Sequence, residues 1–118
     1  MAKSIVKQIG TLVPTFKDDK IIILFGPQAP QELIDISVIH EFTELSEEPL
    51  KVGGIIKFDH QEYEITHVGN VANDNLKELG HVSIYFQEPF DGVLPGAVLV
   101  KPSEVPEINE GTVIEFIS

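Results

Sequence analysis

The sequence predicts an all-β fold: a small barrel-like domain of about eight short strands with one or two short helices. Short segments rich in β-branched and aromatic residues recur along the 118 residues, and turns containing glycine or proline separate them. This spacing of strands is typical of sandwiches and barrels. The length suits one domain spanning residues 1–118, and an apolar fraction of 42% is enough to build one core.

The first half of the chain contains three predicted strands. One is expected near residues 5–9. Five consecutive apolar residues at 21–25 predict a strand buried on both faces, which Gly26-Pro27 ends. Residues 36–42 alternate in character and place His40 on the apolar face. His40 is therefore expected to point into the core or toward its rim.

The second half of the chain repeats this pattern, with strands expected at 55–58, 63–68, 82–86, 97–100 and 113–117. The first two of these are joined by a short polar turn and predict a hairpin. Glycine turns precede three of the five strands, at Gly53-Gly54, Pro95-Gly96 and Glu110-Gly111. Together with the first half, these segments account for about eight strands.

Only two segments have helical character. Residues 30–34 can form about one turn, with Pro30 at the first position. Residues 73–80 make the stronger case, because an Asn/Asp cap precedes two leucines three residues apart and Gly80 suits the C-terminal end. The sequence contains no internal domain boundary.

The composition excludes several classes of function. Nineteen acidic residues against eight basic ones give a net charge of −11 and an isoelectric point near 4.6, a surface that nucleic acids repel. Because cysteine is absent, disulfides, thiol nucleophiles, iron–sulfur clusters and thiolate zinc sites are excluded. All the basic residues are lysine, so this chain offers no guanidinium clamp for a phosphate or carboxylate.

The sequence also carries no signal for export or membrane insertion. Its N-terminus lacks a long apolar segment followed by a small-residue cleavage site. The longest apolar run, residues 21–25, is far shorter than the ~20 residues of a transmembrane helix. A cytoplasmic protein is therefore expected.

Four histidines, His40, His60, His67 and His81, are the natural candidates for chemistry. The sequence contains no His-x-His pair, His-Glu-x-x-His motif, Gly-x-Ser-x-Gly elbow or glycine-rich phosphate loop. His60 is expected in an exposed turn, His67 half-buried, and His81 directly after a helix C-terminus, where an imidazolium is favoured. From its position alone, His40 is better explained as a packed core or rim histidine than as a catalytic residue.

One stretch, VGNVANDNLKELGHV at residues 68–82, is more specific than the strand pattern. It resembles the signature of the glucitol/sorbitol-specific IIA component of the bacterial phosphoenolpyruvate-dependent sugar phosphotransferase system (PTS). The flanking segments are similar too, with Ile39-His40 and Glu44-Leu45 upstream, Leu94-Pro95-Gly96 downstream, and a Gly-x-Val-x-x-Phe strand at 111–116. The resemblance extends over nearly the whole chain.

The resemblance implies a phosphocarrier. In that family a histidine accepts a phosphoryl group from the phosphocarrier protein HPr and passes it to a IIB cysteine. HPr and the IIB and IIC permease components for glucitol/sorbitol would then be the partners, and the membrane is involved only through the permease. The matching acceptor is His40, and His81 lies in the motif as a candidate accessory. Phe42 replaces a second histidine found in family members, and no metal or other cofactor is implied.

Imidazole suits this role, because its pKa near ~6.5 leaves it neutral at cytoplasmic pH and a good leaving group afterwards. Attack by Nε2 is what the family implies. The phosphoryl group adds about −2 to an already acidic chain. We therefore expect the amides from Gly69 to Asn75 to form an N–H cradle for it, and a basic partner to supply the cation.

Two other classes of function stay open at this stage. One is a non-catalytic carbohydrate-binding or interaction β-domain in which His40 is merely packed. The other, less favoured, is a small metal-dependent barrel enzyme. A fully enclosed His40 would favour the first, and a bound transition metal the second.

Overall fold

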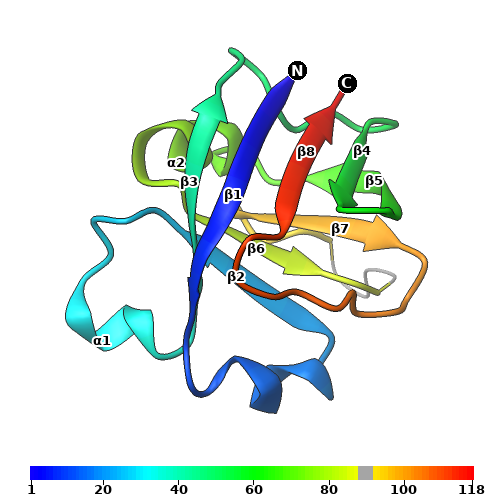
Figure 1. Ribbon diagram of the computed structural model, residues 1–118. Helices are drawn as coiled ribbons and strands as arrows, with labels where there is room; N and C mark the ends of the chain where they lie inside the picture. The colour runs from blue at the N-terminus through cyan, green and yellow to red at the C-terminus, as the bar shows by residue number, and fades with distance from the viewer. Residues whose placement is uncertain (88–91) are drawn as a thin grey trace.

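The computed structural model describes residues 1–87 and 92–118, which form eight strands closed into a barrel, two short α-helices and one 3₁₀ helix. Around the barrel the strands follow the order β1-β3-β2-β6-β7-β5-β4-β8 (Figure 1). Their bounds are Ala2–Ile9 (β1), Ile21–Phe25 (β2), Val38–Glu44 (β3), Ile55–Phe58 (β4), Gln61–Val68 (β5), Val82–Tyr85 (β6), Ala97–Lys101 (β7) and Val113–Ile117 (β8). The predicted all-β, barrel-like class is confirmed.

The barrel is of mixed type. Strand β2 pairs in parallel with β3, and β6 in parallel with β7, whereas the other neighbours are antiparallel. Because β1 pairs with β8, the N- and C-terminal ends of the chain lie side by side (Figure 1). Strand β3 lies between β1 and β2, and helix α2 (Ala72–Leu79) lies beside it.

Side chains that alternate along the strands fill the interior. In β4, for example, Ile56 and Phe58 are fully buried while their neighbours are partly exposed. The rings of Phe58, Tyr63 and Phe86 form one cluster, with centroids 5.0–6.3 Å apart in edge-on or tilted geometry. Closing the sheet also removes the free edges that an open sheet would expose.

Three strands begin at residues other than those predicted, and one of them, β5, starts at Gln61 rather than at residue 63. Strand β1 starts at Ala2 rather than near residue 5, and its inward positions include the buried Ser4. Strand β3 starts at Val38 rather than at residue 36. Its start is delayed because the amides of Ile36 and Ser37 donate to carbonyls of helix α1 (Gln31–Ile34).

The helices differ in their caps. Val71 stands at the N-cap of α2, and the side chain of Asn73 does not cap the helix but bonds both backbone polar groups of Leu50, at 2.8 and 2.9 Å. Gly80 ends α2 with a φ of 69°, as predicted, and Pro30 is the N-cap of α1. The 3₁₀ helix η1 (Val13–Lys17) was not predicted. Among residues 1–87 and 92–118, no helix is long and apolar enough to cross a membrane.

Candidate functional site

His40 lies on β3 with its side chain inside the barrel, and it is 1% exposed. On one side it pairs with Val6 of β1. On the other, β2 ends beside it, because Phe25 pairs with Ile39. Its ring packs 5.1 Å from that of Phe42. The inward orientation agrees with the sequence, and this degree of burial is that of a packed side chain.

Both ring nitrogens of His40 are hydrogen-bonded. Nδ1 lies 2.7 Å from Ser4 Oγ, and Nε2 lies 2.7 Å from the carbonyl oxygen of Gly80. A carbonyl oxygen can only accept, so Nε2–H donates to Gly80. In the neutral ring Nδ1 then accepts from the hydroxyl of Ser4, which is itself fully buried. The two partners therefore select one tautomer.

Burial also sets the charge of this ring. It lowers the pKa of His40 because the charged form is poorly solvated, and the hydrogen bond to Gly80 opposes this shift only in part. Since an ordinary histidine titrates near ~6.5, His40 is neutral at pH 7. The site thus holds an uncharged imidazole in a defined orientation.

The C-terminal end of α2 covers Nε2. The carbonyl of Leu79 accepts from the Gly26 amide at 2.9 Å and from the Gln28 side-chain nitrogen at 2.7 Å, while the next carbonyl, that of Gly80, accepts from His40. A Cβ at Gly80 would lie 2.7 Å from the nitrogen of Gly26. Glycine at position 80 therefore permits both the left-handed φ and the close approach. We call the carbonyl groups of Leu79 and Gly80 the helix-end carbonyls.

The predicted cradle of amides from Gly69 to Asn75 is wrong. These residues surround the start of α2, whereas His40 contacts its end, and eight helical residues span about 12 Å. The Gly69 amide donates to the carbonyl of Ala97, the first residue of β7, at 2.8 Å, and the Val71 amide donates to the carbonyl of Pro95, just before β7, at 3.0 Å. The end of α2 carries a partial negative charge, which suits the donating Nε2–H but opposes an anion.

His81 lies at the same end of the molecule, directly after Gly80. Its Nδ1–H donates to the carbonyl of Leu24 at 3.1 Å, and its ring stacks on Phe25 at 4.6 Å. Both contacts are with β2, the strand that also neighbours His40. His40 thus bonds the Gly80 carbonyl, and His81, the next residue in the chain, fastens the same segment to β2.

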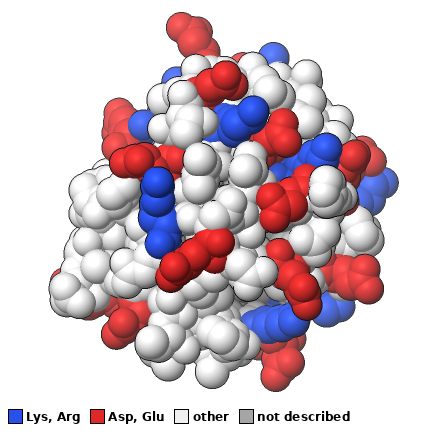
Figure 2. Space-filling view, in the orientation of Figure 1, with Lys and Arg blue, Asp and Glu red and all other residues white. Residues whose placement is uncertain are grey.

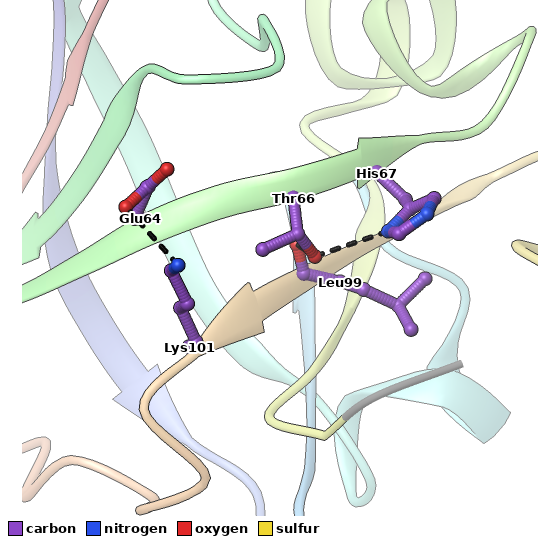
Figure 3. A network of polar contacts seen from close by, with 5 residues as sticks. All are labelled: Glu64, Thr66, His67, Leu99 and Lys101. Carbon is purple, nitrogen blue, oxygen red and sulfur yellow. Dashed lines mark hydrogen bonds and ion pairs between the residues drawn. The ribbon is translucent and has the colours of Figure 1, made fainter.

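The other two histidines lie elsewhere. His60 is exposed in the turn between β4 and β5. His67 was expected to be half-buried but is exposed, because the β5–β7 pairing is irregular between Ile65 and His67 and turns the side chain outward. Its Nδ1 contacts Thr66 Oγ1 at 3.1 Å (Figure 3). Strand β5 lies four strands from β3 in either direction, so His67 is on the opposite side of the barrel from His40.

A groove of about 310 Å³ is separate from His40 and offers little for sugar recognition. It lies between η1 and the loop before β8, and its lining is mainly apolar: Ile9, Val13, Pro14, Ile21, Ile22, Val105, Pro106 and Ile108, with Lys17, Glu107 and Asn109. No histidine is among these residues. Within residues 1–87 and 92–118, no three His, Asp or Glu side chains are grouped as a metal ion would require.

Comparison with known proteins identifies the family. The model of the family described as "PTS system glucitol/sorbitol-specific IIA component" matches residues 1–115. The chain belongs to this IIA family. The resemblance noted at residues 68–82 is therefore a true relationship, and it extends over almost all of the chain.

Named members of the IIA family are similar along their lengths. The glucitol/sorbitol-specific EIIA components of Shigella flexneri and Escherichia coli (strain K12) are each 34% identical over 113 residues, which is 96% of this chain and 91% of theirs. The crystal structure of a PTS system IIA component from Enterococcus faecalis V583 superposes with a TM-score of 0.87 at 30% identity, covering 98% of this chain and 99% of that one.

In this IIA chain, some of the residues around His40 could be predicted from the sequence and others could not. Gly80 and His81 lie in the family motif, and each contributes to the site. Ser4 and Gln28 belong to no motif and were missed. The alternating burial of residues 2–6 turns Ser4 inward in the structure, but the residue types there do not alternate, and the predicted first strand began after Ser4.

Proposed function

We propose that this IIA chain is a cytoplasmic phosphocarrier that accepts a phosphoryl group from phospho-HPr on His40 and passes it to a cysteine of the IIB component. The permease then uses this phosphoryl group for the uptake and phosphorylation of glucitol/sorbitol. Family membership supports the role as a PTS component. The assignment to His40 rests on one observation: its imidazole is neutral and is oriented by hydrogen bonds at both nitrogens.

The transfer needs a neutral ring with an available lone pair. The lone pair of Nε2 attacks the phosphorus on the HPr histidine, the donor's N–P bond breaks, and its electron pair stays on the donor ring, so each ring keeps one N–H. Positioning and charge stabilisation suffice, because the transition state of phosphoryl transfer is loose. In the next step a IIB thiolate attacks the phosphorus, and the bond to Nε2 breaks.

Nε2 is the nitrogen that can be uncovered. Nδ1 faces Ser4 in β1, which is paired on both sides within the barrel, whereas Nε2 faces the end of a short helix. For Nε2 to attack, the ring proton has to reside on Nδ1. Ser4 Oγ can accept that proton's hydrogen bond, because a hydroxyl both donates and accepts. Ser4 therefore serves either tautomer from the same position.

Access to His40 requires the end of α2 to move. The Gly80 carbonyl lies 2.7 Å from Nε2, where the phosphorus has to approach, and the partial negative charge at the helix end repels a phosphoryl group. We propose that the partner binds the opened form, as in enzymes whose lids move on microsecond to millisecond timescales. His81 is the accessory in this scheme, because it holds the hinge side of the moving segment against β2.

Charge compensation then falls largely to the partner. The chain carries −11 and has no arginine. On the face shown in Figure 2, acidic side chains and lysines are interspersed, with no segregated basic patch. A basic carrier would be attracted to such a surface and would supply the cation at the transferring group.

Incubation with phosphoenolpyruvate, enzyme I and HPr tests the proposal. We expect stoichiometric phosphate that is labile to acid and stable to alkali, absent from His40→Ala and retained by His67→Ala, the exposed histidine on the opposite side of the barrel. Phosphate that persists in His40→Ala would contradict the assignment to His40. A wild-type protein that takes up none would contradict the phosphocarrier function.

The burial of His40 favours a second candidate, an interaction β-domain in which this side chain is only packed. The two candidates differ in the same experiment. If His40 is only packed, His40→Ala loses stability but the wild-type protein accepts no phosphoryl group. Circular dichroism of both proteins before labelling separates loss of fold from loss of the acceptor.

A further inference from the structure

We propose that the Gln28 side chain and the Gly26 backbone amide form the binding site for the phosphoryl group carried by His40. In the resting protein the helix-end carbonyls occupy this site. The inference rests on the proposed function, because it concerns the same histidine. In a chain without arginine, these two N–H donors would contact the phosphoryl oxygens instead of a guanidinium group.

Three hydrogen-bond donors converge on the helix-end carbonyls. The Gly26 amide and the Gln28 side-chain nitrogen both donate to Leu79, at 2.9 and 2.7 Å, and His40 Nε2 donates to Gly80 at 2.7 Å. When the helix end leaves, two of these donors lose their acceptor next to the nitrogen that receives the phosphoryl group. They are then free for the oxygens of that group.

The distances suit this exchange. A Cβ placed on Gly80 would be 2.7 Å from the Gly26 nitrogen and 3.4 Å from His40 Nε2, so these two nitrogens lie within about 6 Å of each other. A phosphoryl oxygen bonded through phosphorus to Nε2 covers part of that span, and an N–H···O hydrogen bond of about 2.9 Å covers the rest. The Gly26 amide is buried beside His40, whereas Gln28 is exposed at the surface. The two donors therefore lie between the surface, where a partner delivers the phosphoryl group, and His40, which accepts it.

Charge determines which acceptor these donors prefer. A hydrogen bond to an ionised oxygen is roughly twice as strong as one to a neutral carbonyl. In addition, the phosphoryl group is repelled by the helix end but attracted by backbone and side-chain N–H groups. For these two donors, phosphorylation therefore replaces one neutral acceptor, the Leu79 carbonyl, by an anionic one, and both hydrogen bonds become stronger.

The test measures the equilibrium between phospho-HPr and the phosphorylated IIA chain for the wild type, for Gln28→Ala and for Gln31→Ala. Gln31 is the matched control, an exposed glutamine three residues further on in helix α1. We expect Gln28→Ala to lower the equilibrium constant about fivefold, since a charged hydrogen bond is lost from the product and a neutral one from the reactant. Gln31→Ala should equal the wild type. In ¹⁵N NMR spectra, the Gly26 amide and the Gln28 side-chain amide should shift on phosphorylation.

A purely structural Gln28 predicts the opposite sign. If Gln28 only fastens the helix end, Gln28→Ala loosens the cover over His40, and the equilibrium constant stays equal or rises. That result, with His40 phosphorylated in both proteins and the two amide signals unmoved, overturns this inference but leaves the proposed function intact. A wild-type protein without phosphohistidine overturns both.

Discussion

Replacing Ser4 by alanine deletes the partner of His40 Nδ1, and we expect the free energy of unfolding to fall by about 2 kcal/mol, the middle of the range for a buried acceptor left unpaired. The two atoms lie 2.7 Å apart, and the side chains of Ser4 and His40 are 0% and 1% exposed. Water therefore has no ready access to the vacated position. The loss should appear as a hydrogen-bond effect, because the substitution removes one oxygen and leaves the β1 backbone pairing in place.

Ser37 supplies the matched control. It is also 0% exposed, but its Oγ has no hydrogen-bond partner among the described residues. Ser37→Ala removes a hydroxyl that is already buried and unpaired, so we expect no loss and up to about 1 kcal/mol of gain. Since both substitutions delete one buried oxygen, the difference between them isolates the hydrogen bond to His40.

Urea unfolding at neutral pH measures both variants, with unchanged m-values as the sign that the unfolded states are comparable. Ser4→Thr, which keeps the hydroxyl, should recover most of the stability lost in Ser4→Ala. Equal effects of Ser4→Ala and Ser37→Ala would refute the reasoning. So would a Ser4→Ala protein as stable as the wild type.

Two further predictions concern the same region, and a third concerns the charge of the whole chain. Burial lowers the pKa of His40 in the folded protein, so the unfolded chain binds more protons below about pH 6.5. The free energy of unfolding should therefore fall as the pH is lowered from there, by at most about 1.4 kcal/mol per pH unit. Unfolding curves between about pH 7 and 5.5 should show a weaker dependence of this free energy on pH for His40→Gln than for the wild type, and an equal dependence contradicts the prediction. Gly80→Ala should cost about 3 kcal/mol, or about 10 °C in Tm, because it combines a left-handed residue with a Cβ 2.7 Å from Gly26. Gly53→Ala, with a φ of 89° and open space around it, should show the smaller backbone cost alone, and equal losses argue against the close approach. Finally, transfer from HPr should slow as ionic strength rises, because the chain carries −11, and a stopped-flow rate independent of salt removes the case for electrostatic steering.

The strands were predictable because their signals are local. Alternation of apolar residues and glycine turns do not depend on what the strand later contacts, and residues 21–25, 55–58 and 113–117 form strands with the bounds predicted. The predicted strand bounds and helix cap were wrong where a contact with a distant segment changes the local structure. Strand β3 starts late because helix α1 takes two amides, and the cap expected from Asn73 instead bonds Leu50.

The site was predictable only in part. His40 was indicated by its motif and its inward position, but its partners were not. Ser4 and Gln28 lie 36 and 12 residues before His40, and neither belongs to a pattern that would connect it with a histidine. The exposure of His67 depends on an irregular register between β5 and β7, which the residues of β5 alone do not predict.

The sequence by itself determined the class of fold, the acidic surface without cysteine or arginine, and the family motif that contains Gly80 and His81. Only the tertiary structure decided that the end of α2, not its start, covers His40. That choice depends on how Ala72 and Leu76 pack into the core and on Gly26 and Gly80, which approach each other just beyond the paired ends of β2 and β6. Contacts between segments so far apart in the chain leave no periodicity in the sequence. The helix end explains the left-handed glycine at position 80 locally, but the close approach of Gly80 to Gly26 depends on a distant segment and could not be predicted.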